Sequence, residues 1–212
     1  MRRRDFFGTF AFGLLLSPYA AAQLNGPGKS SNQESYPFGT EYDWTRYARP
    51  EQLQPSGKWN TWIIAKGAGW GKSRACTEWI RLRVETGEFK SIGLVCEDYS
   101  DLRELVCSQT NGLTAICPPW NKPVYSESRQ SVVWTNPNCK SYNAHVDLYL
   151  SENLDSMRGL SHDGIVLHDL AMYRCADYIP LARQALRVHK DAKIVVATYP
   201  SISRCTQHGT TT

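Results

Sequence analysis

The chain reads Lys66-Gly67-Ala68-Gly69-Trp70-Gly71-Lys72-Ser73 between an apolar run, Trp59–Ala65, and a stretch with helical periodicity, Lys72–Val84. Glycines at alternate positions let the backbone turn its N–H groups toward one point and let a ligand approach closely. A helix that begins at Lys72 directs the positive end of its dipole at the same point. A strand, a Gly-rich turn and a helix in this order are typical of a phosphate-binding loop.

The end of this loop matches the P-loop pattern Gly-x-x-x-x-Gly-Lys-[Ser/Thr], although its first position is Lys66 instead of glycine. In this pattern Lys72 contacts the β and γ phosphates of ATP, and the Ser73 hydroxyl binds Mg²⁺. We therefore predict that residues 66–73 bind a nucleotide. The alternative is a Gly-rich turn that binds nothing, and the Gly-Lys-Ser at a helix start, directly after a buried strand, argues against it.

Apolar runs alternate with helical patterns along the rest of the chain. The predicted strands are Trp59–Ala65, Ser91–Cys96, Ile165–Leu167 and Lys193–Thr198, and the predicted helices are Lys72–Val84, Asp101–Cys107 with Ser100 as N-cap, and Ala176–Val188. A β-hairpin is predicted from Val132–Trp134 and Ser141–Ala144, on either side of Asn136-Pro137-Asn138. Strands separated by helices predict the α/β class, with a mainly parallel sheet covered by helices on both faces.

The composition indicates one folded domain with a tail at each end. Hydrophobic residues make up 42% and charged residues 21% of 212 residues, which excludes wholesale disorder. The net charge of +4 permits contact with nucleic acid but does not require it. The chain has seven cysteines, none at Cys-x-x-Cys spacing, so neither a zinc knuckle nor a redox pair is predicted. The odd number also disfavours a complete set of disulfides and favours a reducing compartment.

The chain ends differ from the predicted domain, which covers residues 44–205. Residues 1–23 combine Arg2-Arg3-Arg4, an apolar run from Phe6 to Leu16 and Ala20-Ala21-Ala22, which is the layout of an export signal. The alternative is a basic and apolar tail on an intracellular domain, and the cysteine pattern favours this alternative. The apolar run is too short to span a bilayer. Residues 24–43 are rich in Gly, Ser, Asn and Pro, which predicts a linker, and residues 206–212 form a tail.

From about Trp44 to Arg204 the sequence resembles the terminase large subunits of tailed phages and related gene-transfer particles. The similar motifs are Ala48-Arg49-Pro50-Glu51-Gln52-Leu53, the phosphate loop, Thr77-Glu78-Trp79-Ile80-Arg81, and Asp155-Ser156-Met157-Arg158-Gly159. The resemblance implies a P-loop ATPase domain that uses ATP and Mg²⁺ to drive double-stranded DNA into a capsid. It also implies a portal protein, a terminase small subunit and a homo-oligomeric ring as partners, no membrane, and the host cytoplasm as location, with export as a minor alternative.

The resemblance implies roles for three further residues. Terminases carry a basic residue early in the loop, and Lys66 would take that role and stabilise charge on the transferring γ-phosphoryl group; the alternative is a solvated loop charge. Gln52 would contact adenine, or it is a surface glutamine. Thr198, followed by Tyr199-Pro200, resembles a motif that senses the γ-phosphate, or it is an ordinary strand end before a proline.

The second ATPase motif departs from the pattern of the terminases. A P-loop ATPase needs a carboxylate at the end of a buried strand for the metal and a neighbouring acid for the attacking water. In the terminases this is Asp-Glu, whereas here His168 and Asp169 follow Gly164-Ile165-Val166-Leu167. A neutral imidazole is a poor partner for Mg²⁺. Either Asp169 binds Mg²⁺ together with Ser73, or Asp169 is the base and Mg²⁺ rests on Ser73 and the phosphates. Both alternatives predict weak turnover.

Two hypotheses for the function follow. The first is an ATPase module for translocating double-stranded DNA, without nuclease activity, because the nuclease domain of full-length terminases has no counterpart among the 212 residues. The second is a catalytically degenerate, nucleotide-binding interaction protein without motor activity. The substitution at His168 favours the second hypothesis. Nucleotide binding with and without Lys72 separates both of them from a generic α/β domain.

Overall fold

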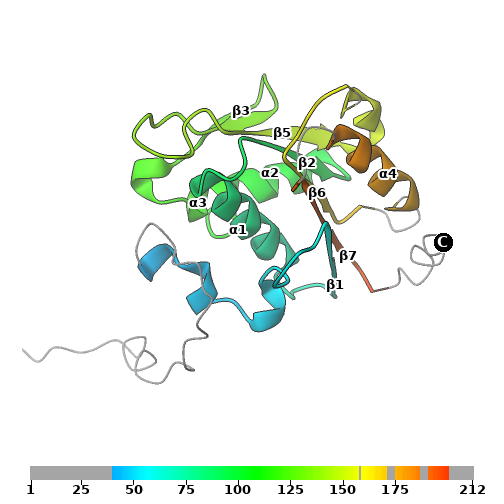
Figure 1. Cartoon of the computed structure of the whole chain (residues 1–212), viewed down its shortest axis with the longest axis horizontal. Coiled ribbons are helices and arrows are strands. Elements are labelled where there is room, and N and C mark those ends of the chain that lie inside the picture. The colour runs from blue at the N-terminus through cyan, green and yellow to red at the C-terminus, as the bar shows by residue number, and fades with distance from the viewer. Residues whose placement is uncertain (1–39, 158, 171–174, 187–190, 201–212) are drawn as a thin grey trace, which may run out of the picture. The chain divides into compact units, whose positions relative to one another are not determined.

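The computed structural model describes residues 40–157, 159–170, 175–186 and 191–200. Within these residues, a seven-stranded sheet has the order β1-β7-β6-β2-β5-β4-β3 (Figure 1). The first five strands in this order are parallel, and β4 and β3 are antiparallel additions at one edge. The strands are β1 (Thr61–Ala65), β2 (Ser91–Cys96), β3 (Val124–Ser126), β4 (Ser131–Val133), β5 (His145–Leu150), β6 (Gly164–His168) and β7 (Lys193–Thr198).

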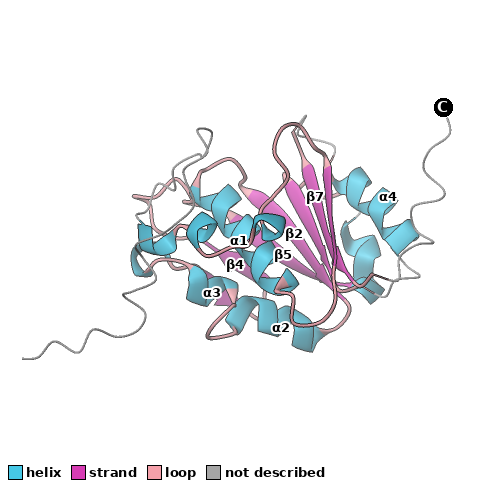
Figure 2. Ribbon diagram, turned by 90° about the horizontal axis from the view of Figure 1, so that it is seen from below, coloured by secondary structure: helices cyan, strands magenta, loops and turns pink. Residues whose placement is uncertain are grey.

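Helices cover both faces of this sheet, as predicted (Figure 2). One face carries α1 (Lys72–Glu85), α2 (Tyr99–Cys107) and α3 (Leu113–Ile116), and the other carries α4 (Cys175–Ala185). The short 3-10 helices are η2 (Thr40–Tyr42), η3 (Trp44–Arg46), η4 (Pro50–Gln52), η5 (Pro119–Asn121) and η6 (Ser151–Met157). The predicted α/β class with a mainly parallel sheet is therefore confirmed. None of the helices in the described residues is long and apolar enough to cross a membrane.

The core consists of two apolar clusters, one on each face of the sheet. The cluster under α1 contains Trp79, Ile80 and Leu94, and the cluster under α4 contains Ile165 and Leu167. The strands β2, β6 and β7 lie inside the sheet and contact both clusters, which explains their nearly continuous apolar sequences. Because these strands are parallel neighbours, their carboxyl ends lie side by side at one end of the strands. This end is called the carboxyl edge of the sheet below.

Two local predictions need correction. The helix α2 begins at Tyr99, and its N-cap is Asp98, whose carboxylate accepts the Asp101 N–H at 2.9 Å, so Ser100 lies inside the first turn. Asp98 is the N-cap because a charged carboxylate interacts with the positive end of the helix dipole more favourably than a neutral hydroxyl does.

The predicted hairpin is also wrong in its second strand. The strand that pairs with β4 is β5 from His145 onward, whereas Ser141–Asn143 form a turn that returns the chain to Trp134. The sequence did not predict β3 or β5. The helix predicted to end at Val188 ends at Ala185, and residues 187–190 lie outside the described part.

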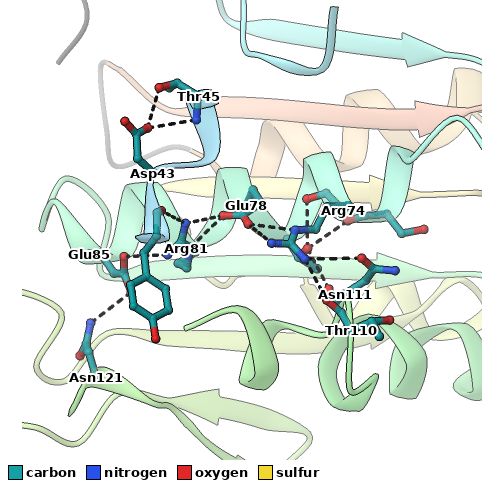
Figure 3. A network of polar contacts seen from close by, with 12 residues as sticks. Asp43, Thr45, Arg74, Glu78, Arg81, Glu85, Thr110, Asn111 and Asn121 are labelled. Carbon is teal, nitrogen blue, oxygen red and sulfur yellow. Dashed lines mark hydrogen bonds and ion pairs between the residues drawn. The ribbon is translucent and has the colours of Figure 1, made fainter. Parts of the chain in front are cut away.

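A buried chain of charges runs along α1 (Figure 3). Arg81 lies between Glu78, at 2.6 Å, and Glu85, at 3.7 Å, and all three side chains are buried. The guanidinium of Arg81 also donates to the carbonyl of Tyr42 at 2.6 Å. The composition predicted that residues 40–43 belong to the linker. Instead they form η2 and the N-cap of η3 and lie against α1. This network anchors the beginning of the described chain to the helix that follows the phosphate loop.

Burial raises the pKa of the Glu85 carboxyl from 4.5 to about 7, and Arg81 only partly opposes this shift. Because the folded chain then binds this proton more tightly than the unfolded chain, the contribution to stability is complete below the ordinary pKa and is lost as the pH rises through about 7. We expect Glu85→Gln to raise the free energy of unfolding by about 1–3 kcal/mol at pH 8 and to change it little at pH 5. Urea denaturation at both pH values measures this difference. The exposed Glu104→Gln is the control, and an equal gain at both pH values would contradict the prediction.

Candidate nucleotide-binding site

Three loops meet at the carboxyl edge of the parallel strands. The strands β1, β7 and β6 are neighbours, so the residues that follow them, Lys66–Gly71, Tyr199 and Asp169, lie at one edge. The backbone N–H of Lys66 donates to the carbonyl of Thr198 at 3.0 Å, which continues the β1–β7 pairing into the loop. The predicted phosphate loop therefore lies beside the second motif, although the two are about a hundred residues apart in sequence.

The loop ends in a left-handed turn at the start of α1. Gly71 is the N-cap of α1 with φ of 90°, and Gly69 has φ of 72°, so both glycines adopt a conformation that other residues disfavour. The side-chain amide of Gln52 donates to the carbonyl of Trp70 at 3.1 Å, and Arg49 donates to the same carbonyl. These contacts hold the tip of the loop against η4. Both are made to a carbonyl, so they do not use the backbone N–H groups at the helix start.

Alanine at position 71 is expected to disrupt the loop. Its Cβ would lie 2.6 Å from Nε2 of Gln52 in a backbone conformation with positive φ. We expect Gly71→Ala to lower the free energy of unfolding by about 1–3 kcal/mol. Thermal unfolding measures this effect. Adding Gln52→Ala should recover part of the stability, and full stability of the single variant would contradict the prediction.

Lys72 is buried, with 6% of its surface exposed, and contacts three groups at the centre of the site. Its ammonium lies 3.5 Å from a carboxylate oxygen of Asp169, donates to the carbonyl of Gly67 at 3.4 Å, and lies 4.0 Å from the ring centre of Tyr199. The carboxylate, the carbonyl and the aromatic face each attract the ammonium and together hold this buried charge in place. Local sequence did not predict the contact with Tyr199.

His168 contacts the residue that was predicted to bind the metal. Its Nε2 lies 3.0 Å from Oγ of Ser73, and the ring is 4% exposed. Burial lowers the pKa of His168. The charge of Asp169 opposes this shift and the charge of Lys72 adds to it, so the imidazole favours its neutral form. The other ring nitrogen, Nδ1, has no hydrogen-bond partner among the described residues.

Asp169 follows β6 in a left-handed conformation with φ of 43°, and its N–H donates to the carbonyl of Ala197 at 2.8 Å. A non-glycine residue in this conformation is uncommon and is often found at functional sites. One carboxylate oxygen lies near Lys72 and the other lies 4.0 Å from Nε2 of His168. Asp101 is a further acid near this site. Its carboxyl has a raised pKa, mainly because of burial, then because of the charge of Asp98, and to a smaller extent because of the charge of Asp169.

Several polar atoms at this edge have no hydrogen-bond partner among the described residues. They are Nδ1 of His168, Oδ1 of Asp169 and Oγ1 of Thr198. The Thr198 side chain is fully buried, and the Asp169 oxygen has only the ion pair with Lys72. Buried polar atoms normally have partners, and clusters of exceptions suggest a ligand, an ion or water.

The residues at this site fit Mg²⁺ poorly. Mg²⁺ prefers oxygen ligands in octahedral geometry, and the strand-end group nearest Ser73 is an imidazole. The one carboxylate that follows the strand, Asp169, is paired with Lys72. In the described part of the chain, no group of three or more His, Cys, Asp or Glu side chains could hold a metal ion. A metal here would need the oxygens of a bound phosphate as additional ligands.

The other predicted site residues lie around the loop. Lys66, Gly67, Ala68 and Gly69 are exposed, and the ammonium of Lys66 lies 5.8 Å from the ring centre of Trp70. Gln52 is buried, so the alternative of a surface glutamine is wrong; both ends of its amide contact backbone groups of Arg49 and Trp70. Arg49 is a second contact of the loop that the sequence did not predict, although it lies in the motif Ala48–Leu53.

No protein-family profile and no curated protein matches the sequence. Solved structures do match. The large terminase of a thermophilic bacteriophage, in complex with ADP, is similar with a TM-score of 0.53 and 15% identity over 74% of this chain and 36% of that chain. The large terminase ATPase domain of Thermus phage P74-26 is similar with a TM-score of 0.54 and 15% identity, over 68% of this chain and 61% of that one. The described chain therefore has the fold of a large-terminase ATPase domain and spans only part of the length of these proteins.

Proposed function

We propose that this chain binds ATP at the loop 66–73 and is an ATPase module of the terminase type, which drives double-stranded DNA into a capsid. The observation that carries the proposal is the position of Lys72. It lies buried at the start of α1, directly after a strand and a Gly-rich loop, with Asp169 of a neighbouring loop 3.5 Å away. The ADP bound to one terminase of the same fold supports the choice of nucleotide.

Each residue of the loop has a role in this proposal. The N–H groups of residues 67–73 and the dipole of α1 would bind the phosphates, and Lys72 would leave Asp169 for the β and γ phosphates. Ser73 and Asp169 would supply protein ligands for the metal ion. Lys66 would add positive charge at the γ-phosphate, and Thr198, whose hydroxyl has no partner among the described residues, would sense that group. Gln52 would position the loop and approach the base.

Binding of nucleotide is the test of this function. Isothermal titration calorimetry of the full chain with ADP and with a non-hydrolysable ATP analogue, each with a divalent cation, should show one site per chain. Circular dichroism before titration establishes that the protein is folded. If folded protein bound neither nucleotide under any of these conditions, the proposed function would be wrong.

Hydrolysis is expected to be slow. The position next to the metal is an imidazole, and Asp169 has to serve either as metal ligand or as base. Loss of a general base or of its positioning costs about 10²–10⁴-fold in rate. We therefore expect turnover about 10²–10⁴-fold below the typical enzyme value of about 10 s⁻¹. A steady-state phosphate-release assay measures it, and turnover at the typical value would contradict this expectation.

A second candidate is a nucleotide-binding interaction protein without motor activity. The hydrogen bond between Ser73 and His168 favours it, because this bond occupies the hydroxyl that an ATPase uses for its metal. Stimulation of phosphate release by double-stranded DNA distinguishes the two candidates. The motor module should respond to DNA, and the interaction protein should not. The portal protein, the small subunit and a ring of identical chains are partners that belong to the motor hypothesis only.

A further inference from the structure

The mismatch between this site and Mg²⁺ suggests a different metal ion, an inference that rests on the proposed nucleotide binding. The two groups nearest the expected position of the metal are Nε2 of His168 and Oγ of Ser73, 3.0 Å apart. Two ligands bound at about 2.1 Å and at a right angle to each other lie about 3.0 Å apart. A metal ion could therefore replace the hydrogen-bond proton without moving either side chain.

The chemistry of the donors selects the type of ion. Imidazole nitrogen suits first-row transition metals, whereas Mg²⁺ prefers oxygen and releases its water reluctantly. The second carboxylate oxygen of Asp169 lies 4.0 Å from Nε2 of His168, close enough to bind the same ion directly or through a water molecule. Nitrogen, hydroxyl and carboxylate together form a mixed set that fits Mn²⁺ or Co²⁺ better than Mg²⁺.

The nucleotide completes this set. The described residues contain no group of three or more His, Cys, Asp or Glu side chains that could hold a metal ion, so the phosphate oxygens have to supply the remaining ligands. The same phosphates compete with Asp169 for Lys72, which releases the carboxylate toward the ion. If Nε2 binds the ion, the proton of the neutral ring lies on Nδ1. Because Nδ1 has no protein partner among the described residues, a water molecule has to accept its hydrogen bond.

We propose that this site binds its nucleotide together with a first-row transition-metal dication rather than Mg²⁺, with Nε2 of His168 and Oγ of Ser73 as adjacent ligands. The ion is specific to the complex with nucleotide. His168 is then a metal ligand in place of the carboxylate that a Mg²⁺ site uses at this strand end.

The first test compares the affinity for ADP in MnCl₂ and in MgCl₂ by calorimetry with the full chain. We expect the wild-type ratio of the two dissociation constants to favour Mn²⁺ by about tenfold or more, and His168→Asp to reduce this ratio by a similar factor. The comparison of ratios removes the general difference between Mn²⁺ and Mg²⁺ as partners of ADP. His145→Gln, at the opposite end of the parallel strands, is the matched control and should keep the wild-type ratio.

The second test does not depend on a His168 variant, so it remains decisive if His168→Asp fails to fold. Electron spin-echo spectroscopy of Mn²⁺–ADP bound to protein labelled with ¹⁵N-histidine detects a nitrogen ligand directly. We expect a strong ¹⁵N coupling in the wild-type complex and the same coupling in His145→Gln. The control matters because His145 lies 3.6 Å from Asp147, and this pair could bind Mn²⁺ at the surface.

The outcomes separate this inference from the proposed function. Binding of ADP with a ¹⁵N coupling and a Mn²⁺ preference that depends on His168 supports the inference. Binding of ADP without a coupling, or with the same ratio in wild type and His168→Asp, overturns the inference but leaves nucleotide binding intact. A coupling that disappears in His145→Gln also overturns it. The absence of ADP binding with either metal overturns the proposed function and this inference together.

Discussion

Lys72→Ala is expected to weaken the binding of ADP and ATP analogues by about a hundredfold or more. The ammonium of Lys72 is buried, and its nearest anion, Asp169, is 3.5 Å away. A bound phosphate would receive charge-assisted hydrogen bonds from this group, each worth about 1.5–3 kcal/mol. In the variant the carboxylate of Asp169 also remains at the site without its counter-charge and repels the phosphates. Calorimetry with the full chain measures the loss of affinity.

The control for this experiment is Lys122→Ala, which removes an exposed lysine that follows η5. It should bind nucleotide as the wild type does, because it keeps the site and changes the net charge by the same amount. Both variants should first be compared with the wild type by circular dichroism. A folded Lys72→Ala variant with unchanged affinity would show that phosphates bind elsewhere or not at all.

Arg81→Met is expected to cause the largest loss of stability, about 3–5 kcal/mol at pH 8. Arg81 is 1% exposed and lies between the carboxylates of Glu78 and Glu85, while it also donates to the carbonyl of Tyr42. Methionine fills a similar volume but leaves the buried Glu85 carboxylate without its cation and the buried Glu78 carboxylate with Arg74 alone. Because domains are stable by about 5–15 kcal/mol, this loss is a large part of the total.

Urea denaturation measures the effect of Arg81→Met, and the pH dependence identifies its cause. At pH 5 the loss should be smaller, because Glu85 takes up its proton and one buried charge disappears. The exposed Arg103→Met, on α2, is the matched control and should change the free energy of unfolding by less than about 0.5 kcal/mol. A loss for Arg81→Met that did not depend on pH would contradict the electrostatic explanation.

The elements that local sequence predicted well are those with a strong pattern of their own. The loop 66–73 carries its glycines and its Gly-Lys-Ser directly between an apolar strand and a helix, so β1 and α1 were predicted within two residues of their observed bounds. The same holds for β2 and β7, whose apolar runs are buried on both faces of the sheet. The α/β class followed from the alternation of these patterns, and the similar terminase structures agree with it.

The antiparallel edge was predicted less well for a physical reason. The strand β5, His145–Leu150, has buried residues only at alternate positions and begins one residue after the turn Ser141–Asn143. Its pairing with β2 and β4 depends on residues more than ten positions away. The turn signal Asn136-Pro137-Asn138 indicates that a strand follows but not the residue at which it begins, so the predicted second strand lies a few residues before the observed one.

For the candidate site, local sequence was sufficient to identify the phosphate loop and to locate the unusual His168-Asp169 pair. Only the tertiary structure revealed that His168 contacts Ser73, that Lys72 pairs with Asp169, and that Gln52 holds Trp70. The reason is that a glycine-rich turn and a helix start are specified by neighbouring residues, whereas these contacts join side chains from separate segments. They form because the parallel order of β1, β7 and β6 brings three loops to one edge of the sheet.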